Sequence, residues 1–445
     1  MWNGKDKVLK ERLFGLGNYQ GNHGEDVKEL YYYLDNIPTH YYMQMLYKYP
    51  QQEFPYAKLI EENSKRSKLE PECEILDTGI FDDNKYFDVL VTYAKYNKKD
   101  IGIKIDITNR GKAAAPITIL PTLLFYNRWQ SAKKKKKPLI KEVNRTTVKA
   151  THKRLKDYYL YFQKPDTRFF TENETNYEKL FKKPNETEFV KDAINDAVVD
   201  KQNVEALKKN TSGTKFSPVY NLNIKAGATR TIYLRLSDVF LDEPFAHGFE
   251  KIFIQRKKEA DEYYDEILPG NISQDLKNIQ RQALAGILWS KQFYYYDIEK
   301  WLSKSDGIAP LSDHRKNGRN HDWQHLKNQD IILMPDKWEY PWYAAWDLGF
   351  HCIAMAMVDP VFAKHQLILI MREWYMKPDG QIPAYEWNFG DVNPPVHAWS
   401  SLQVYHIEKR KTGKGDITFL KKKKKKLIIN FTWWINRKDP NGNNM

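Results

Sequence analysis

The chain has 445 residues, of which 41% are hydrophobic and 14% aromatic, and its formal net charge is +14. This length exceeds one ordinary domain, so we expect two or more domains with buried cores. Two lysine runs, Lys133–Lys137 and Lys421–Lys426, hold 11 of the positive charges, and removing them leaves 14 − 11 = +3. The charge is therefore local and argues against a nucleic-acid partner. The runs are interpreted as solvated loops or local irregularities, and a binding tail is the less favoured alternative.

Two cysteines, Cys73 and Cys352, imply no disulfide framework. No apolar run approaches the roughly 18 residues of a membrane span, and the first residues lack the apolar core of a signal peptide. We therefore expect a cytoplasmic protein without a membrane partner. The 11 histidines are scattered and form no metal-binding motif, so neither a metal nor another cofactor is expected. A cluster at His23, Glu25 and Asp26 is better explained as a polar turn.

The N-terminal half is predicted to be rich in β-strands. Residues 1 to about 60 are expected to be rich in loops and in aromatic residues, and residues 61–72 a charged surface segment. Alternation of apolar and polar residues then predicts strands at 87–94, 101–108, 116–125 and 229–236, with the same pattern at 158–172 and 216–236. Short strands separated by Gly, Pro and Asn turns favour an antiparallel β-sandwich, which we assign to residues 1–245.

The C-terminal half is predicted to be helical. A linker helix at 249–267 falls within an assigned linker of residues 246–272, and Ser273 is a candidate N-cap for a helix at 274–301. An irregular polar loop is expected at 302–335. Further helices are predicted at 346–358, at 362–376, from Pro394-Pro395 to about 410, and near 417–436. Repeated helix–turn–helix units are typical of an α/α array, which we assign to residues 273–445.

Asp347 is the candidate catalytic residue. It lies in the first turn of the helix at 346–358, where the simplest role of a carboxylate is to stabilise the helix dipole. However, aromatic residues precede or flank it in the sequence, namely Trp338, Tyr340, Trp342, Tyr343 and Trp346. Rings that exclude water would keep its carboxyl protonated, as cleavage of a glycosidic bond by a general acid requires.

A second acidic and aromatic patch contains Glu386 and Trp387, which are candidates for sugar binding. It lies in the loop at 380–396, which follows one predicted helix and precedes another. The patch at 336–346 also precedes a helix, so both loops are expected at the same end of the helical array, facing one pocket. The alternative for the second loop is a rigid turn that is anchored by prolines and buries its tryptophan.

Three segments carry a resemblance to a known family. The hexapeptide from Trp346 to His351 resembles the Trp-Asp-x-Gly-Phe-His segment of processing α-glucosidases in glycoside hydrolase family 63. Residues 334–351, 381–399 and 170–177 resemble large bacterial glucosidases of this family, to which mannosylglycerate hydrolases are related. The resemblance covers nearly the whole chain apart from the lysine runs.

This resemblance implies a fold and a chemistry. The family combines an N-terminal β-sandwich with an (α/α)6 barrel, so residues 273–445 are expected to form part of such a barrel. It implies inverting hydrolysis of a glucose- or mannose-containing oligosaccharide or glycoside, with Asp347 as the general acid. The general base would be a glutamate beyond Met445, so the chain is expected to be a fragment, clipped also at its N-terminus. The expected substrate-binding residues are Trp338, Glu339, Trp342, Trp346, His351, Glu386 and Trp387.

A second hypothesis is a non-catalytic carbohydrate-binding or structural protein of the same architecture. Hydrolysis of α-glucosides and α-mannosides separates this hypothesis from the enzyme. The sequence leaves open the sugar, the linkage and the oligomeric state.

Overall fold

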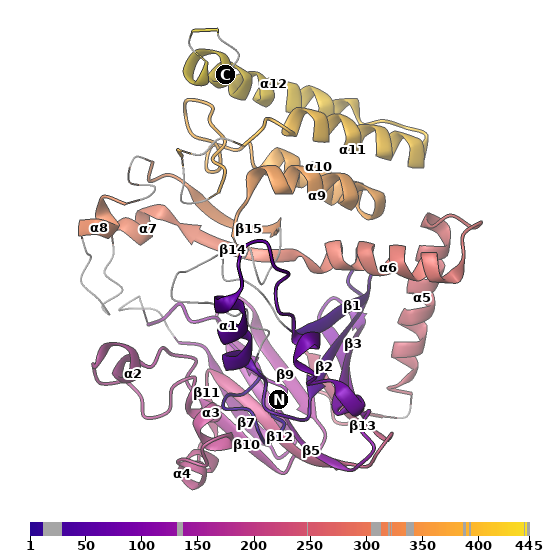
Figure 1. Ribbon diagram of the computed structural model, residues 1–445, viewed down its shortest axis with the longest axis vertical. Coiled ribbons are helices and arrows are strands. Elements are labelled where there is room, and N and C mark those ends of the chain that lie inside the picture. The colour runs from indigo at the N-terminus through magenta and orange to yellow at the C-terminus, as the bar shows by residue number, and fades with distance from the viewer. Residues whose placement is uncertain are drawn as a thin grey trace. The chain divides into compact units, whose positions relative to one another are not determined.

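The computed structural model describes residues 1–11, 29–130, 137–246, 248–303, 313–318, 321, 323–334, 342–385, 389–390, 393–439 and 441–442. They form two compact units. Unit 1 contains the described residues of Met1–Leu16, Asp26–Asp35 and Thr39–Asp261, and unit 2 those of Asn36–Pro38 and Glu262–Met445. The sheet-rich region precedes the helices along the chain (Figure 1), which confirms the predicted mixed class of β followed by α.

Two sheets make up most of unit 1. The larger one has the strand order β1-β2-β3-β4-β13-β9-β8-β7-β11, and the smaller one the order β10-β12-β5, with β6 paired to β12. The strands are β1 Leu30–Asn36, β2 Tyr42–Pro50, β3 Tyr86–Asn97, β4 Asp100–Asn109, β5 Ala115–Ile119, β6 Leu123–Leu124, β7 Leu139–Asn144, β8 Thr147–His152, β9 Lys156–Phe162, β10 Thr167–Thr171, β11 Ser212–Gly213, β12 Lys215–Ile224 and β13 Thr229–Ser237.

Short helices accompany these strands. They are α1 Tyr56–Lys65, the 3-10 helices η1 Ile75–Thr78 and η2 Asp82–Asn84, α2 Tyr177–Phe181, α3 Ala193–Val198 and α4 Val204–Lys208. The longer α5, Lys251–Ile267, follows the last strand and matches the predicted linker helix.

Apolar side chains connect the elements of unit 1. The ring of Phe162 on β9 lies 5.3 Å from that of Phe216 on β12, so the two sheets contact each other through aromatic residues. Ile194 of α3 and Leu207 of α4 share a buried cluster with residues of β10 and β12. A β-sandwich remains a prediction that these contacts favour.

The predicted strands at 87–94, 101–108 and 229–236 are confirmed by β3, β4 and β13. The predicted strand at 116–125 is divided into β5 and β6 around Pro121, which has no N–H to donate to a sheet. The loop-rich region predicted at residues 1 to about 60 also contains β1, β2 and the start of α1, which were not predicted. Large tyrosines, among them Tyr47 and Tyr49, are buried there as core residues.

The described part of unit 2 contains a series of helices and a two-stranded antiparallel sheet. Its elements are α6 Gln274–Trp289, β14 Lys291–Asp297, α7 Ile298–Ser303, α8 Asp313–Lys316, β15 Lys327–Leu333, α9 Ala345–Val358, α10 Pro360–Leu369, α11 His397–Thr412, α12 Ile417–Trp433 and the π-helix η3 Trp434–Lys438. Ser273 caps α6 as predicted, because its Oγ accepts a hydrogen bond from the Leu276 N–H at 3.2 Å. No described helix has both the length and the apolar composition that a membrane span needs.

Two predictions for unit 2 are wrong. The predicted helix at 274–301 ends at Trp289, and the loop predicted at 302–335 contains β15. β14 pairs antiparallel with β15, opposing Phe293 to Ile331. The aromatic run from Phe293 to Tyr296 explains the change, since aromatic residues favour strands. The helix predicted at 362–376 is also shorter than expected, because α10 ends at Leu369.

Gly349 of α9 allows a close approach to α11. A Cβ added there would lie 3.1 Å from Val396 Cγ2, 3.2 Å from Ser400 Oγ and 3.4 Å from His397 Nδ1. Three atoms at the start of α11 therefore occupy the space that any other side chain would need. This contact fixes the N-terminal half of α9, which carries Asp347, against α11.

Gly349→Ala is expected to lower the free energy of unfolding by about 1–2 kcal/mol, since the added methyl group overpacks this crossing. Gly286→Ala in α6 is the matched control, because no atom lies within 4 Å of its added Cβ. The control is expected to be stabilising by up to about 1 kcal/mol through helix propensity. Urea unfolding of both variants measures the difference, and equal effects of the two substitutions would contradict a tight α9–α11 contact.

Candidate functional site

Asp347 stands in the first turn of α9 with its carboxylate unused by the fold. The N-cap residue is Ala344, and no side chain caps the helix. Within the described part of the chain, Asp347 is partly buried and has no hydrogen bond or ion pair. By contrast, Asp359 and Asp416 cap α10 and α12 by accepting hydrogen bonds from backbone N–H groups at 2.9 Å. Asp347 therefore differs from the structural aspartates of the same unit.

The start of α9 is joined to the second predicted patch. Ala344 forms an antiparallel β-bridge with Tyr385, and the Ala345 N–H donates to the Ala384 carbonyl at 3.0 Å. The two loops that the sequence predicts at one end of the helices therefore meet at this point. A common pocket remains a prediction.

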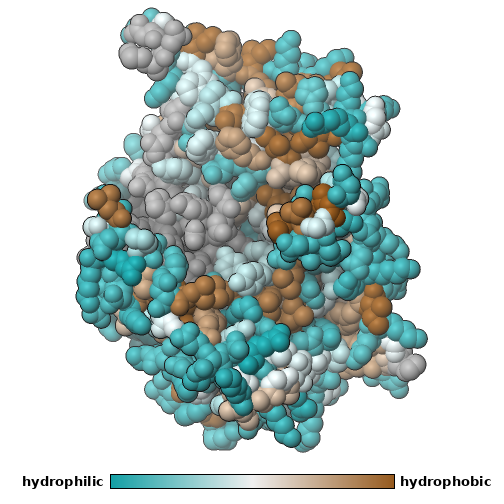
Figure 2. Space-filling model, turned by 45° about the vertical axis from the view of Figure 1, so that its right-hand side comes forward, coloured by the Kyte–Doolittle hydropathy of each residue, from teal (hydrophilic) through white to brown (hydrophobic). Residues whose placement is uncertain are grey.

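Aromatic rings form a row beside Asp347. Trp346 and Phe350, one turn apart on α9, have ring centroids 5.9 Å apart, and Phe350 and Trp399 of α11 are 5.7 Å apart. All three are exposed, at 36%, 43% and 49%. At the height of α9 to α12, apolar side chains reach the surface among polar ones (Figure 2). Exposed rings next to a free carboxylate can stack on the apolar face of a sugar.

His351 follows Asp347 by one helical turn. Burial lowers the pKa of its imidazole, and the nearby Asp347 carboxylate acts in the opposite direction. Its Nδ1 atom is buried and has no hydrogen-bond partner among the described residues. A role of His351 as a sugar contact remains a prediction.

The other predicted substrate-binding residues divide into two groups. Trp342 is partly buried. Trp338, Glu339, Glu386 and Trp387 lie outside the described residues. Tyr343, expected beside Asp347, is fully buried with its ring 5.4 Å from that of Tyr375, so it belongs to the core.

Two buried polar residues on α11 were not singled out from the sequence. His397 Nδ1 and Ser400 Oγ face Gly349 and have no hydrogen-bond partner in the part of the chain that the structure describes. Burial lowers the pKa of His397 to about 3, and the charge of Lys423 acts in the same direction. Their only signal in the sequence is their position just after Pro394-Pro395, at the start of a predicted helix.

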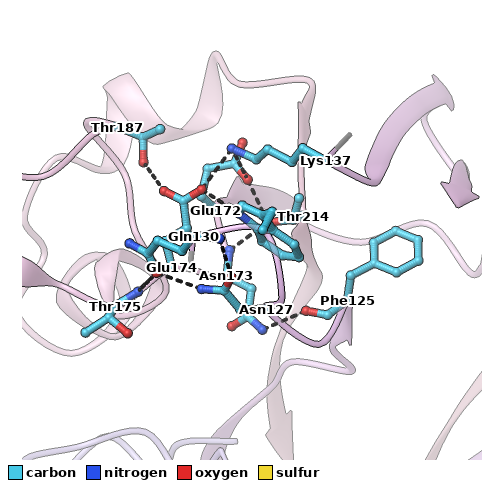
Figure 3. A network of polar contacts seen from close by, with 11 residues as sticks. Phe125, Asn127, Gln130, Lys137, Glu172, Asn173, Glu174, Thr175, Thr187 and Thr214 are labelled. Atoms are coloured by element: carbon cyan, nitrogen blue, oxygen red, sulfur yellow. Dashed lines mark hydrogen bonds and ion pairs between the residues drawn. The ribbon is translucent and has the colours of Figure 1, made fainter. Parts of the chain in front are cut away.

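The third family-like segment, residues 170–177, forms a polar network in unit 1 (Figure 3). Glu174 accepts hydrogen bonds from Trp129 Nε1 at 2.7 Å and from Thr187 Oγ1 at 3.3 Å. Lys137 Nζ lies 3.0 Å from Glu174 and 2.9 Å from Glu172. Glu172 also accepts from Thr214 Oγ1 at 2.6 Å. Both carboxylates are bonded within the protein, so the network holds loops together.

Lys137 is the cation of this network. Burial alone would lower the pKa of its amine, but the hydrogen bonds and charges of Glu172 and Glu174 outweigh it and raise the pKa. Lys137 is the last residue of the first lysine run, whose other members lie outside the described residues. This lysine is therefore part of the fold of unit 1.

Glu174→Gln is expected to lower the free energy of unfolding by about 1–3 kcal/mol, because a buried carboxylate loses its charge opposite Lys137. Glu186→Gln is the control, since Glu186 is exposed and its replacement should change stability by less than about 0.5 kcal/mol. Chemical denaturation of the two variants, followed by circular dichroism of the sheet signal, tests this role. An unchanged free energy of unfolding in Glu174→Gln would show that the network contributes nothing to stability.

No group of three or more potential metal ligands occurs among the residues that the structure describes.

The chain was compared with known protein families, and one family model matches the part that contains Asp347. Residues 340–445 match the family model of the mannosylglycerate hydrolase MGH1-like glycoside hydrolase domain. This match confirms the predicted resemblance to such glycoside hydrolases over the residues that it covers. It includes α9, Asp347 and the aromatic row.

One curated relative matches the whole chain. It is the uncharacterized protein YMR196W of Saccharomyces cerevisiae, 43% identical over 492 residues, a match that covers 100% of this chain and 45% of the relative. The chain thus spans less than half the length of this relative. A solved structure named "Putative kojibiose phosphorylase from human microbiome" matches 77% of this chain and 43% of its own, at 10% identity and a TM-score of 0.21. That score is too low to support a conclusion about the fold.

Proposed function

We propose that the chain is part of an inverting O-glycosidase that hydrolyses α-linked glucose- or mannose-containing oligosaccharides or glycosides. Asp347 is the general acid that protonates the leaving oxygen. The observation that carries this proposal is the free carboxylate of Asp347, which lies in the glycoside hydrolase segment and is used by no hydrogen bond among the described residues.

The surroundings of Asp347 supply substrate contacts in this proposal. Trp346, Phe350 and Trp399 stack on sugar rings, and His351 is a further proposed sugar contact. Trp338, Glu339, Trp342, Glu386 and Trp387 remain proposed sugar contacts. In an inverting pair the second carboxylate stands about 6.5–9.5 Å from the acid and activates a water molecule. We assign that role to no residue of this chain. A cytoplasmic location is part of the same proposal.

The proposal is tested by incubating the full-length protein with a panel of α-glucosides and α-mannosides and following the products by proton NMR. Inverting hydrolysis releases the β-anomer first, before mutarotation. Release of the α-anomer first would contradict the inverting mechanism, and no hydrolysis of any member would contradict the enzyme.

A carbohydrate-binding protein without catalysis is the second candidate, and the exposed aromatic row favours it as much as it favours the enzyme. Calorimetric binding of oligosaccharides without turnover would support this alternative. Loss of that binding in Trp399→Ala would show that the sugar binds to the aromatic row of Trp346, Phe350 and Trp399.

A further inference from the structure

Lys423 is buried in the helical core of unit 2. It belongs to the second lysine run, yet it is 1% exposed, whereas Lys421, Lys422, Lys424 and Lys425 on the same helix are exposed. The prediction that this run is solvated is therefore wrong for Lys423. α12 turns one lysine inward because the 3.6-residue period places position 423 on the face that also buries Phe419 and Asn430.

The Lys423 amine contacts α10 and the residues that follow it. The Leu367 carbonyl of α10 accepts its hydrogen bond, and Met371 Sδ, just beyond the end of α10, lies 2.7 Å away. From α9 and α11, the ionisable groups that interact with it are Cys352 and His397. No carboxylate pairs with Lys423 in the described part of the chain.

The nearby charged groups are engaged elsewhere or are neutral. Lys364 of α10 pairs with Glu408 at 2.7 Å and with Asp416 at 2.9 Å. Burial raises the pKa of the Cys352 thiol and lowers that of His397, so both are uncharged at neutral pH. A charged Lys423 would thus have one carbonyl acceptor and no counter-charge, and such a buried ion is strongly unfavourable.

We propose that the protonation state of Lys423 controls the packing of the last helices of unit 2. The neutral amine holds α12 against α10 and α11, and protonation weakens this packing. The effect reaches α9, which carries Asp347, through α11, because Gly349 of α9 packs against the start of α11.

The direction of the pH dependence follows from linkage. Burial lowers the pKa of Lys423 to about 7, from an ordinary value of 10.5, and the interaction with Cys352 opposes this only in part. In the open form, in which α12 has separated from its neighbours, the Lys423 amine binds a proton more tightly than in the packed form. The packing is therefore most stable above pH 10.5 and weakens as the pH falls toward 7, where both forms become protonated. Over this range the opening equilibrium constant changes up to about tenfold per pH unit.

The test measures how strongly the packing protects the Cys352 thiol, which is fully buried. Cys73 and any further cysteine are replaced by serine, so that Cys352 is the thiol that reacts. This full-length protein is labelled with a thiol reagent between pH 7.5 and 10. At each pH the rate is divided by that of the unfolded protein, which removes the intrinsic reactivity of the thiol.

The protection of Cys352 is expected to rise several-fold to about tenfold per pH unit. Lys423→Met should make it independent of pH and about a hundredfold higher at pH 7.5, whereas Lys422→Met, at an exposed neighbour, should leave the wild-type curve unchanged. A flat wild-type curve, or the wild-type slope retained in Lys423→Met, would overturn the proposal. Far-UV circular dichroism verifies that each variant is folded.

Discussion

Asp347→Asn in the full-length protein is expected to lower the turnover of α-linked oligosaccharides by about 10²–10⁴-fold, the usual contribution of a general acid. Asparagine has nearly the same shape but cannot donate a proton to the leaving oxygen. Steady-state kinetics on α-linked oligosaccharides measure this loss of turnover. It should appear in kcat, with little change in KM.

Stability separates this effect from a structural one. Since the Asp347 carboxylate makes no hydrogen bond among the described residues, Asp347→Asn should change the free energy of unfolding by less than about 0.5 kcal/mol. Asp359→Asn is a matched comparison, because Asp359 caps α10 and pairs with Lys291 at 3.2 Å. Asparagine keeps the cap but leaves the Lys291 ammonium without its counter-charge, so this variant should destabilise unit 2 by about 1 kcal/mol or more. Near-normal turnover in Asp347→Asn would sink the assignment.

Gly380→Ala is expected to be the most destabilising glycine substitution in unit 2, at about 3–5 kcal/mol. Gly380 has φ +97°, a conformation that other residues adopt at a cost, and its added Cβ would lie 2.5 Å from the Ile429 carbonyl oxygen. The Gly380 carbonyl also accepts a hydrogen bond from Asn430 at 2.8 Å. Alanine would therefore separate the loop at 380–385 from α12.

Gly413→Ala provides the control for backbone strain alone. Gly413 ends α11 at φ +72° with no atom within 4 Å of an added Cβ, so its replacement should cost only about 1–2 kcal/mol. Thermal and urea unfolding compare the two variants. Equal losses would show that the contact between Gly380 and α12 contributes nothing. Because the loop continues to Tyr385, which bridges Ala344, Gly380→Ala should also reduce turnover.

The sequence predicted those features of the site that depend on local signals. Asp347 begins a helix as expected, and Asp359-Pro360 separates α9 from α10. The bridge between Ala344 and Tyr385 agrees with the expectation that both loops lie at one end of the helices. Helix starts and alternating helices could be inferred because capping residues, prolines and apolar periodicity act over a few residues.

Features that depend on distant partners could not be predicted. Glu174 and its partner Trp129 are 45 residues apart, and no sequence pattern links them. Lys423 is buried although a lysine run carries no apolar signal, since only the packing of α12 decides which lysine points inward. The two-stranded sheet of β14 and β15 was missed because the apolar residues of β14 also fit a helical period.

The dependence of Asp347→Asn on the leaving group tests the central claim most directly. The full-length protein and the variant are compared on an alkyl α-glycoside and on the corresponding α-glycosyl fluoride, for both glucose and mannose. Fluoride departs without protonation by a general acid. If Asp347 is the acid, the variant loses about 10²–10⁴-fold on the alkyl glycoside and keeps most of its rate on the fluoride. An equal loss on both substrates would contradict this role.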